Sequence, residues 1–288
     1  MCLSQLNVER ESVNQREEAR RLRCAVLVEA RYLAQAQPSG LLSVLRERGH
    51  DAVVVDPEAW SVEAGDAGWF EGIDCLVARG RSWAVLSLLG WAEAAGIRTI
   101  NRWHAVSLVH NKADQAVRLR AAGLPVPPTY FGSIPQLASR FRARDYPVIL
   151  KPVFGDNGNG LRIVENRREL LALDWPEPVA LAQKFIRNSG WDLKLYAIGD
   201  NVWAVRKPTP WAAPAEAVLL RVAPPWRELA HRCGALFGLD LFGVDCVETD
   251  AGPVIIEVNE FPNYSGVPAA SERLADYVLA RASKENPS

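Results

Sequence analysis

Apolar and polar positions in the first third of the chain alternate between short β-branched runs and amphipathic stretches. The elements that this pattern predicts, in chain order, are a strand at 24–30, a helix at 39–49, strands at 51–56 and 74–80, a helix from the cap residue Ser82 to about Gly96, and a strand at 97–101. Strands that alternate with helices are typical of a parallel sheet, so we predict a parallel α/β module. Its first loop lacks G-x-G-x-x-G, the dinucleotide-binding fingerprint.

The rest of the chain mixes helices with hairpins, which gives an α/β and α+β fold class. The predicted elements are helices at 110–123, 135–144, 167–173, 225–238 and 271–282, strands at 146–152, 161–165, 179–186, 241–248 and 253–259, and a hairpin at 191–207 that turns at Gly199-Asp200-Asn201. The predicted modules are a tail at 1–22, the α/β module at 23–106, a central part at 107–187, a C-terminal part at 188–282 and a tail at 283–288.

Two acids and an amide lie in the last predicted hairpin, although desolvating such groups is costly. The segment 250–252 fits a three-residue turn, and centring it on Ala251 sets Asp245 opposite Glu257, with Asn259 on the same face. Like charges that face each other destabilise a sheet, so a cation is expected between them, and these oxygens suit Mg²⁺. The alternative is an exposed strand end with solvated acids.

The loop FGDNGNG at 154–160 follows the predicted strand that contains Lys151. Its glycines would let backbone N–H groups approach phosphates while Lys151 supplies charge, although an Asn-Gly pair is also a common hairpin tip. Lys112 lies in the first turn of its predicted helix, where the helix dipole disfavours a cation by about 0.3–1 kcal/mol. A docked anion would reverse that penalty, and an ordinary surface lysine is the alternative.

Other charged residues occupy positions where ligands often bind. Asp192, Lys194 and Arg206 lie on the arms of the hairpin that precedes the proline-rich loop. Arg206 either stabilises charge on a transferring phosphoryl group or forms a cross-strand ion pair with Asp192. Arg79 and Arg81 follow a strand of the first module at its C-terminal end, where ligands gather in α/β sheets. They either bind an acidic substrate or lie on the surface.

Composition and charge exclude several classes of protein. The 288 residues are 49% hydrophobic and 23% charged, with a formal net charge of -1, so no excess of basic residues indicates nucleic acid or an anionic membrane as a partner. No apolar run reaches the roughly 18 residues of a membrane-spanning helix, and the N-terminal segment lacks the apolar core of a signal peptide. The five cysteines form no paired framework, which favours a reducing cytoplasm, and the four histidines lack the spacing of a zinc site.

Five segments in this order resemble the ATP-grasp superfamily, and within it the RimK-like ribosomal-protein glutamate ligase branch of carboxylate–amine ligases. They are HNKADQAVRLRAAGLPVPPT, YPVILKPVFGDNGNGLRIVE, LAQKFI, GWDLKLYAIGDNVWAVRK and GLDLFGVDCVETDAGPVIIEVNEFPNYSGV. The resemblance implies an N-terminal pre-ATP-grasp domain followed by central and C-terminal ATP-grasp subdomains, which hold ATP between them. The ordered set is far more specific than any one of its members.

The resemblance also implies roles for individual residues. The implied ATP-binding residues are Lys112, Lys151, the glycine-rich flap residues Gly155, Asp156, Asn157, Gly158 and Gly160, the hinge residues Gln183, Lys184, Phe185 and Ile186, and Asp192 and Lys194. Lys184 stands where the family usually has glutamate. Arg206 and Lys151 are the implied catalytic cations, and Asp245, Glu257 and Asn259 match the magnesium ligands, with Mn²⁺ as an alternative metal. For the substrates we select Arg79, Arg81, Trp211 and Asn263.

The implied activity is ATP-dependent ligation of a carboxylate to an amine through an acyl phosphate, with release of ADP and phosphate. An amino acid such as glutamate, or a peptide, is the expected acid, and the acceptor is an amine, a peptide or a protein. Two alternatives are an ATP-grasp module that binds nucleotide without turnover and a small-molecule kinase. The sequence leaves the identity of both substrates open, and the oligomeric state as well, a homo-oligomer included.

Overall fold

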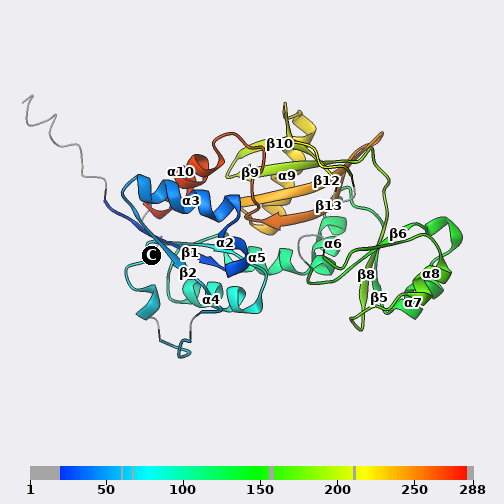
Figure 1. Cartoon of the computed structure of the whole chain (residues 1–288), viewed down its shortest axis with the longest axis horizontal. Helices are drawn as coiled ribbons and strands as arrows, with labels where there is room; N and C mark the ends of the chain where they lie inside the picture. Colours follow the sequence, from blue (N-terminus) through cyan, green and yellow to red (C-terminus); the bar gives the residue numbers. More distant parts are fainter. Residues whose placement is uncertain (1–19, 60, 67, 156–158, 210–211, 284–288) are drawn as a thin grey trace, which may run out of the picture.

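The computed structural model describes residues 20–283 apart from 60, 67, 156–158 and 210–211, so most of both predicted tails lies outside it. The described residues form three sheets, one in each predicted part of the chain (Figure 1). This confirms the mixed α/β and α+β class.

The first sheet is parallel, as predicted, with strand order β2-β1-β3-β4. Its strands are β1 (Arg23–Val28), β2 (Asp51–Val55), β3 (Cys75–Arg79) and β4 (Thr99–Ile100), and its helices are α2 (Ala30–Leu33), α3 (Ala36–Glu47) and α4 (Trp83–Ala94) with the short 3-10 turn η1 (Gly68–Phe70). Ser82 caps α4 by accepting a hydrogen bond from the backbone N–H of Val85, which confirms the predicted helix start.

The middle sheet is antiparallel and has the strand order β5-β8-β6-β7. Its elements are β5 (Thr129–Gly132), α7 (Ile134–Arg140), η2 (Ala143–Asp145), β6 (Val148–Lys151), β7 (Arg162–Val164), α8 (Arg167–Ala172) and β8 (Ala180–Lys184). Helices α7 and α8 cover one face of this sheet, at the end of the molecule farthest from the first module (Figure 1). The opposite face is left to line the space between the middle and last sheets.

The last sheet is antiparallel and has the strand order β11-β10-β9-β12-β13. Its strands are β9 (Trp191–Ile198), β10 (Asn201–Pro208), β11 (Val218–Leu220), β12 (Leu241–Thr249) and β13 (Gly252–Glu260), and the helices around it are α5 (Trp103–His110), α6 (Lys112–Ala121), α9 (Pro224–Phe237) and α10 (Ala270–Ala282). The short strand β11 was not predicted from the sequence.

Helix α5 was also missed, because the sequence pattern suggested one helix from residue 110 onward. The chain leaves the helical conformation at Asn111 (φ -89°, ψ 102°) and starts α6 at Lys112. The Asn111 side chain accepts hydrogen bonds from the backbone N–H groups of Ala113 and Asp114. Because this cap satisfies the first N–H groups of α6, the break between the two helices is stable and Lys112 occupies the first helical position.

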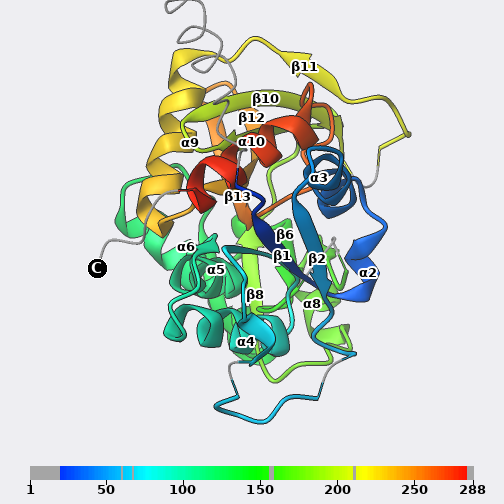
Figure 2. The same cartoon turned by 90° about the vertical axis from the view of Figure 1, so that its left-hand side faces the viewer.

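The two faces of the first sheet pack against different partners. Leu27 and Leu76 point toward α4, whereas Val26 and Val77 point toward α3, α10 and the last sheet. Figures 1 and 2 both show α10, from the end of the chain, beside α3 of the first module. The first and last sheets therefore share one continuous core, which holds the two modules in a defined orientation. In the described part of the chain, no helix is long and apolar enough to cross a membrane.

The contact between α3 and α10 requires a glycine. A Cβ atom added at Gly40 on α3 would overlap Ser271 Oγ on α10. We therefore expect G40A to lower the free energy of unfolding by about 1–3 kcal/mol, as overpacking does elsewhere. Urea unfolding of G40A, S271G and the double variant measures this.

The double variant is the control for this prediction. If the overlap is the cause, G40A should cost much less stability in the S271G background than in the wild type, because the two side chains then no longer collide. Equal costs in the two backgrounds would contradict the assignment.

Candidate functional site

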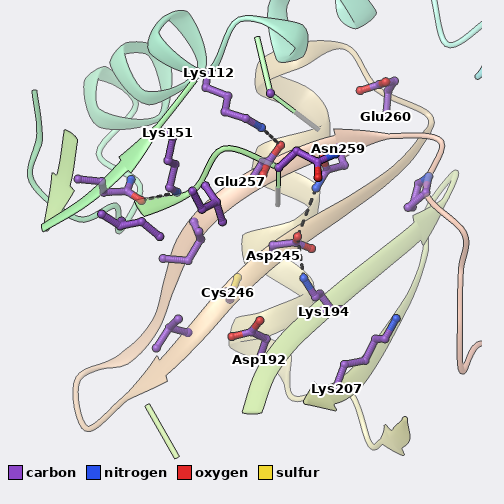
Figure 3. Close-up of a pocket in the computed structure, with 18 of the residues that line it drawn as sticks. Lys112, Lys151, Asp192, Lys194, Lys207, Asp245, Cys246, Glu257, Asn259 and Glu260 are labelled. Atoms are coloured by element: carbon purple, nitrogen blue, oxygen red, sulfur yellow. Dashed lines mark hydrogen bonds and ion pairs between the residues drawn. The ribbon is translucent and has the colours of Figure 1, made fainter. Parts of the chain in front are cut away.

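A cavity of about 360 Å³ lies where the three sheets meet. Its walls come from the loop after β3, the first residue of α6, the end of β6, the end of β8, and one face of β9, β10, β12 and β13 (Figure 3). Carboxylates and ammonium groups from these separate elements point into it. A cavity of this size, lined by convergent charged groups, is typical of a small-molecule site.

The acids of the last hairpin face each other as predicted, but by a different route. The strands turn through two residues, with Thr249 opposite Gly252, whereas the sequence suggested a three-residue turn. A two-residue turn alone would set Asp245 opposite Ile256. A bulge at Ile256 adds one residue to β13, and Asp245 therefore lies opposite Glu257 after all.

Each of the two carboxylates is held by a lysine from another element (Figure 3). Lys194 Nζ lies 2.7 Å from Asp245 Oδ2, and Lys112 Nζ forms an ion pair with Glu257. Asn259 Nδ2 lies 3.4 Å from Asp245 Oδ2, and Glu257 lies opposite Asp245, so the three predicted ligands form one cluster. Lys112 is therefore a buried partner of Glu257, and the surface-lysine alternative is wrong.

The charges in this cluster stabilise one another. Burial alone raises the pKa of Glu257, but Lys112 and Arg81 lower it below its ordinary value. Burial alone lowers the pKa of Lys194, but the nearby carboxylate of Asp245 raises it above its ordinary value. Both groups are therefore charged at neutral pH, and the cavity wall contains pairs of opposite charges.

Lys151 differs from Lys112 and Lys194 because it has no carboxylate partner among the described residues. Its Nζ donates a hydrogen bond to Gln183 Oε1 at 2.7 Å, and only 4% of the residue is exposed. Burial is the main cause that lowers its pKa to about 8, and Lys112 lowers it further while Glu257 opposes the shift. An anion bound next to Lys151 would raise this pKa again, because it would favour the charged form.

The last residue of β8, Lys184, has a side chain that is hydrogen-bonded to backbone carbonyls of the preceding turn. Lys184 Nζ donates to the backbone carbonyls of Arg144, Asp145 and Tyr146, the last at 2.7 Å. Its backbone N–H donates to the carbonyl of Pro128, which has no N–H to return. The Lys184 carbonyl is therefore an available acceptor at the edge of the cavity, and the substitution of glutamate by lysine leaves this backbone group in place.

Arg206 is the predicted cation that the structure places elsewhere. It pairs with Glu248 at 2.8 Å on the other face of the sheet, so among the described residues its ion-pair partner is Glu248 and not Asp192, and its side chain does not line the cavity. The hairpin turns through two residues and aligns Asp192 with Lys207, whereas a three-residue turn would align Lys194 with Arg206. Lys207 lines the cavity in its place. Burial, followed by the charge of Lys194, lowers the pKa of Lys207.

The two predicted arginines of the first module are at least partly buried and line the cavity. Arg79 donates to the carbonyl of Phe261 at 2.5 Å and to Gln35 at 3.0 Å, and its guanidinium stacks on Tyr32. Arg81 Nη2 donates to Asn259 Oδ1 at 2.5 Å. Neither is an ordinary surface residue, and Arg81 brings the first module into contact with the acidic cluster.

Most predicted site residues converge on this one cavity. Those that line it are Lys112, Lys151, Gly155, Gln183, Lys184, Phe185, Ile186, Asp192, Lys194, Asp245, Glu257, Asn259, Arg79, Arg81 and Asn263. Gly160 and Arg206 do not line it, and Asp156, Asn157, Gly158 and Trp211 lie outside the described residues. Among the lining residues that the sequence did not single out are Tyr32, Asn159, Asn188, Tyr196, Lys207, Cys246 and Ser265.

The acidic cluster fits a divalent cation only when other oxygens complete the coordination. Asp245, Glu257 and Asn259 supply hard oxygen ligands and already contact protein cations, so positive charge is stable there. Within the described ranges no group of three or more His, Cys, Asp or Glu side chains could hold a metal. Mg²⁺ is commonly bound by one or two carboxylates together with phosphates of a substrate, and this donor set matches that mode.

Comparison with known proteins identifies the family. The family model of the RimK-like ATP-grasp domain matches residues 110–278. A protein from Hahella chejuensis named probable alpha-L-glutamate ligase 2 is 27% identical over 278 residues, which cover 84% of this chain and 90% of that protein.

Solved structures show the same fold. A RimK domain ATP-grasp protein from Sphaerobacter thermophilus superposes with a TM-score of 0.70 and 23% identity, over 89% of this chain and 99% of that one. The ATP-grasp ligase PsnB, complexed with a precursor peptide and AMPPNP, superposes with a TM-score of 0.67 and 21% identity, over 91% and 98%. PsnB has also been solved with a minimal precursor, Mg and ADP, with a TM-score of 0.64 and 21% identity, over 90% and 97%.

The shifted pKa of Lys151 predicts how stability depends on pH. Its pKa is about 8 in the folded protein and 10.5 for an ordinary lysine, so the unfolded chain binds more protons between these values. The contribution of Lys151 to the stability of the folded state therefore grows by about 3 kcal/mol as pH rises from about 8 to 10.5, while buried cysteines with raised pKa values act in the opposite direction. Denaturant unfolding at several pH values should therefore show the free energy of unfolding of the wild type rising relative to that of K151M by this amount. Parallel pH profiles for the two proteins would contradict it.

Proposed function

The chain belongs to the RimK-like ATP-grasp family and is an ATP-dependent carboxylate–amine ligase, and we propose that the cavity between its three sheets is the active site. One observation supports this assignment above all. The acidic cluster of Asp245, Glu257 and Asn259 and the cations Lys112, Lys151 and Lys194 come from separate elements and meet in one space. That arrangement suits a metal-bound triphosphate, which needs oxygen ligands on one side and positive charge on the other.

We propose that ATP lies between the middle and last sheets. The carbonyl of Lys184 and the backbone of Ile186 would meet the adenine, and Lys112, Lys151, Lys194 and Lys207 would meet the phosphates. Asp245, Glu257 and Asn259 would hold Mg²⁺, or Mn²⁺, which prefers similar oxygen ligands. When bound, the metal would neutralise charge on the β- and γ-phosphates. The ion pairs of Lys112 and Lys194 with these carboxylates would be exchanged for contacts with phosphate oxygens.

The proposed reaction has two steps, in which no side chain acts as a nucleophile. An oxygen of the substrate carboxylate attacks the γ-phosphorus, and ADP leaves with the electron pair of the broken bond. The amine then attacks the acyl carbon, forms the amide and releases phosphate and a proton. The chain contributes by holding the reactants close together and by spreading the charge with its lysines.

For the substrates we propose an amino acid such as glutamate, or a peptide, joined to an amine. The relatives are named alpha-L-glutamate ligases, and PsnB has been solved with a precursor peptide, which supports this substrate class. Arg79, Arg81 and Asn263 line the side of the cavity that the first and last modules share, where the substrates would bind.

A nucleotide-binding module without turnover and a kinase are both disfavoured. The experiment that separates them from a ligase measures ADP release with Mg²⁺ across a panel of amino acids, with hydroxylamine present. Hydroxylamine converts an acyl phosphate into a hydroxamate, whereas a stable phosphorylated product of a kinase does not react in this way. ATP binding without ADP release for any acid would contradict the ligase.

The carboxylates of the acidic cluster should control the dependence on Mg²⁺. We expect D245N and E257Q to raise the Mg²⁺ concentration needed for half-maximal ADP release and to lower kcat by about 10²-fold or more, because each removes a charged metal ligand. A titration of Mg²⁺ at saturating ATP measures both effects. E248Q is the matched control, because Glu248 lies on β12 but pairs with Arg206 on the other face. Wild-type Mg²⁺ dependence in both D245N and E257Q would exclude this site.

The structure also predicts which of two neighbouring cations matters for catalysis. K207A should lower kcat by about 10²-fold, because it removes a charge facing the phosphates, whereas R206A should change kcat less than threefold. R206A and E248A should lower the free energy of unfolding by a similar amount, below about 1 kcal/mol, because their ion pair is partly exposed. Steady-state ADP release and urea unfolding test the two parts. Loss of activity in R206A but not K207A would reverse the assignment.

A further inference from the structure

Arg81 belongs to the first module, but its guanidinium lies in the acidic cluster of the last sheet. Its Nη2 donates to Asn259 Oδ1 at 2.5 Å and lies 3.6 Å from Glu257 Oε1. Asn259 and Glu257 are the proposed metal ligands. An arginine in hydrogen-bond contact with this set is next to any phosphoryl group that the set would hold.

The main chain of Arg81 is held in one position. The backbone N–H groups of Arg81 and Ser82 both donate to Glu29 Oε1, at 2.7 and 2.6 Å, and Glu29 is 1% exposed. A Cβ atom at Gly80 would lie 2.7 Å from Val85 Cγ2 and 2.8 Å from Glu29 Oε1. Only glycine fits at that point, so the loop follows β3 in a single close-packed path and directs Arg81 toward the cavity.

The side chain of Arg81 is held as well. Glu260 Oε1 lies 3.7 Å from Arg81 Nε and 3.0 Å from His110 Nε2, and the side chains of Glu260 and His110 are each 3% exposed. Glu260 follows the ligand Asn259 on β13, so the strand that provides the ligands also orients the guanidinium. Arg81 is thus fixed at both ends before any ligand binds, as preorganised catalysis requires.

One nitrogen of this fixed guanidinium has no partner. Arg81 Nη1 is buried and makes no hydrogen bond to any described residue. Buried donors are almost always satisfied, and guanidinium groups favour the oxygens of phosphates and carboxylates. In contrast, both terminal nitrogens of Arg79 are used, on the carbonyl of Phe261 and on Gln35. Nε of Arg79 is also buried without a hydrogen bond to a described residue, but the terminal nitrogens of Arg79 join the modules, whereas a terminal nitrogen of Arg81 is left for a ligand.

We propose that Arg81 is a catalytic residue that donates from Nη1 to the phosphoryl group while it moves from ATP to the substrate carboxylate. The inference rests on the proposed ligase function. In this step the bond between the carboxylate oxygen and the γ-phosphorus forms and the bond to the β–γ bridging oxygen breaks, with ADP as the leaving group. Arg81 stays protonated and stabilises the charge on the phosphoryl oxygens. The first module would then complete the phosphoryl-transfer site and not only bind substrate.

The test compares binding of the full-length protein to MgADP alone and to MgADP with aluminium fluoride, which mimics the transferring phosphoryl group. In R81A we expect affinity for MgADP to change less than threefold and affinity for the fluoride complex to fall about 30- to 100-fold. R81K should recover only part of this loss, because a lysine keeps the charge but lacks the second guanidinium nitrogen. Isothermal titration gives both affinities without knowledge of the substrates.

R48A is the matched control, because Arg48, directly after α3, pairs with Asp276 on α10 at 2.6 Å and so also joins the first module to the C-terminal part of the chain. It should leave both affinities unchanged. If R81A weakens the two complexes equally, or neither, Arg81 is a structural contact and the proposal is wrong. Hydroxamate formation by the wild type tests the ligase function separately: its absence would overturn that function, whereas its presence with an unchanged affinity ratio in R81A would overturn only the role of Arg81.

Discussion

Two carboxylates that face each other across one hairpin are the constraint on which the arrangement of this protein depends. Like charges directly opposite each other destabilise a sheet, so Asp245 and Glu257 require positive charge beside them. That charge comes from outside their own hairpin: Lys194 from the neighbouring strand, Lys112 from the start of α6 and Arg81 from the first module. The acidic cluster therefore joins distant parts of the chain, and the cavity between the modules follows from this joining.

The same balance of charges explains how the protein can be stable without ligands and still bind a highly charged nucleotide. Without ligands, the lysines neutralise the carboxylates, so little uncompensated charge is buried. With a metal and a triphosphate bound, each carboxylate would exchange its lysine for the metal cation, and each lysine would exchange its carboxylate for a phosphate oxygen. Lys151 and Lys207 differ, because burial lowers the pKa of both and no described carboxylate pairs with either. The site thus combines lysines that are already paired with carboxylates and lysines that would be paired only when an anion binds.

Two hairpins show how finely the site depends on register. Both turn through two residues where the sequence suggested three, and each turn shifts the pairing of its strands by one position. In the β12–β13 hairpin the bulge at Ile256 reverses the shift, and Glu257 returns to the side of Asp245. In the β9–β10 hairpin nothing reverses it, and Lys207 faces the cavity in place of Arg206. A change of one residue in a strand moves every side chain to the opposite face.

The sequence by itself determined the elements with strong periodicity, the parallel first sheet, the family and most residues of the cavity. These depend on local patterns: β-branched runs, caps such as Ser82, and ordered motifs that keep Lys112, Lys151 and the acidic cluster in a recognisable sequence. Only the tertiary structure decided which cation of the pair Arg206 and Lys207 faces the site, and that Arg81 enters the acidic cluster. Local patterns do not contain these facts, because strand register is set by a bulge or turn of one residue and contacts between modules are set by a core that segments far apart in the chain build together.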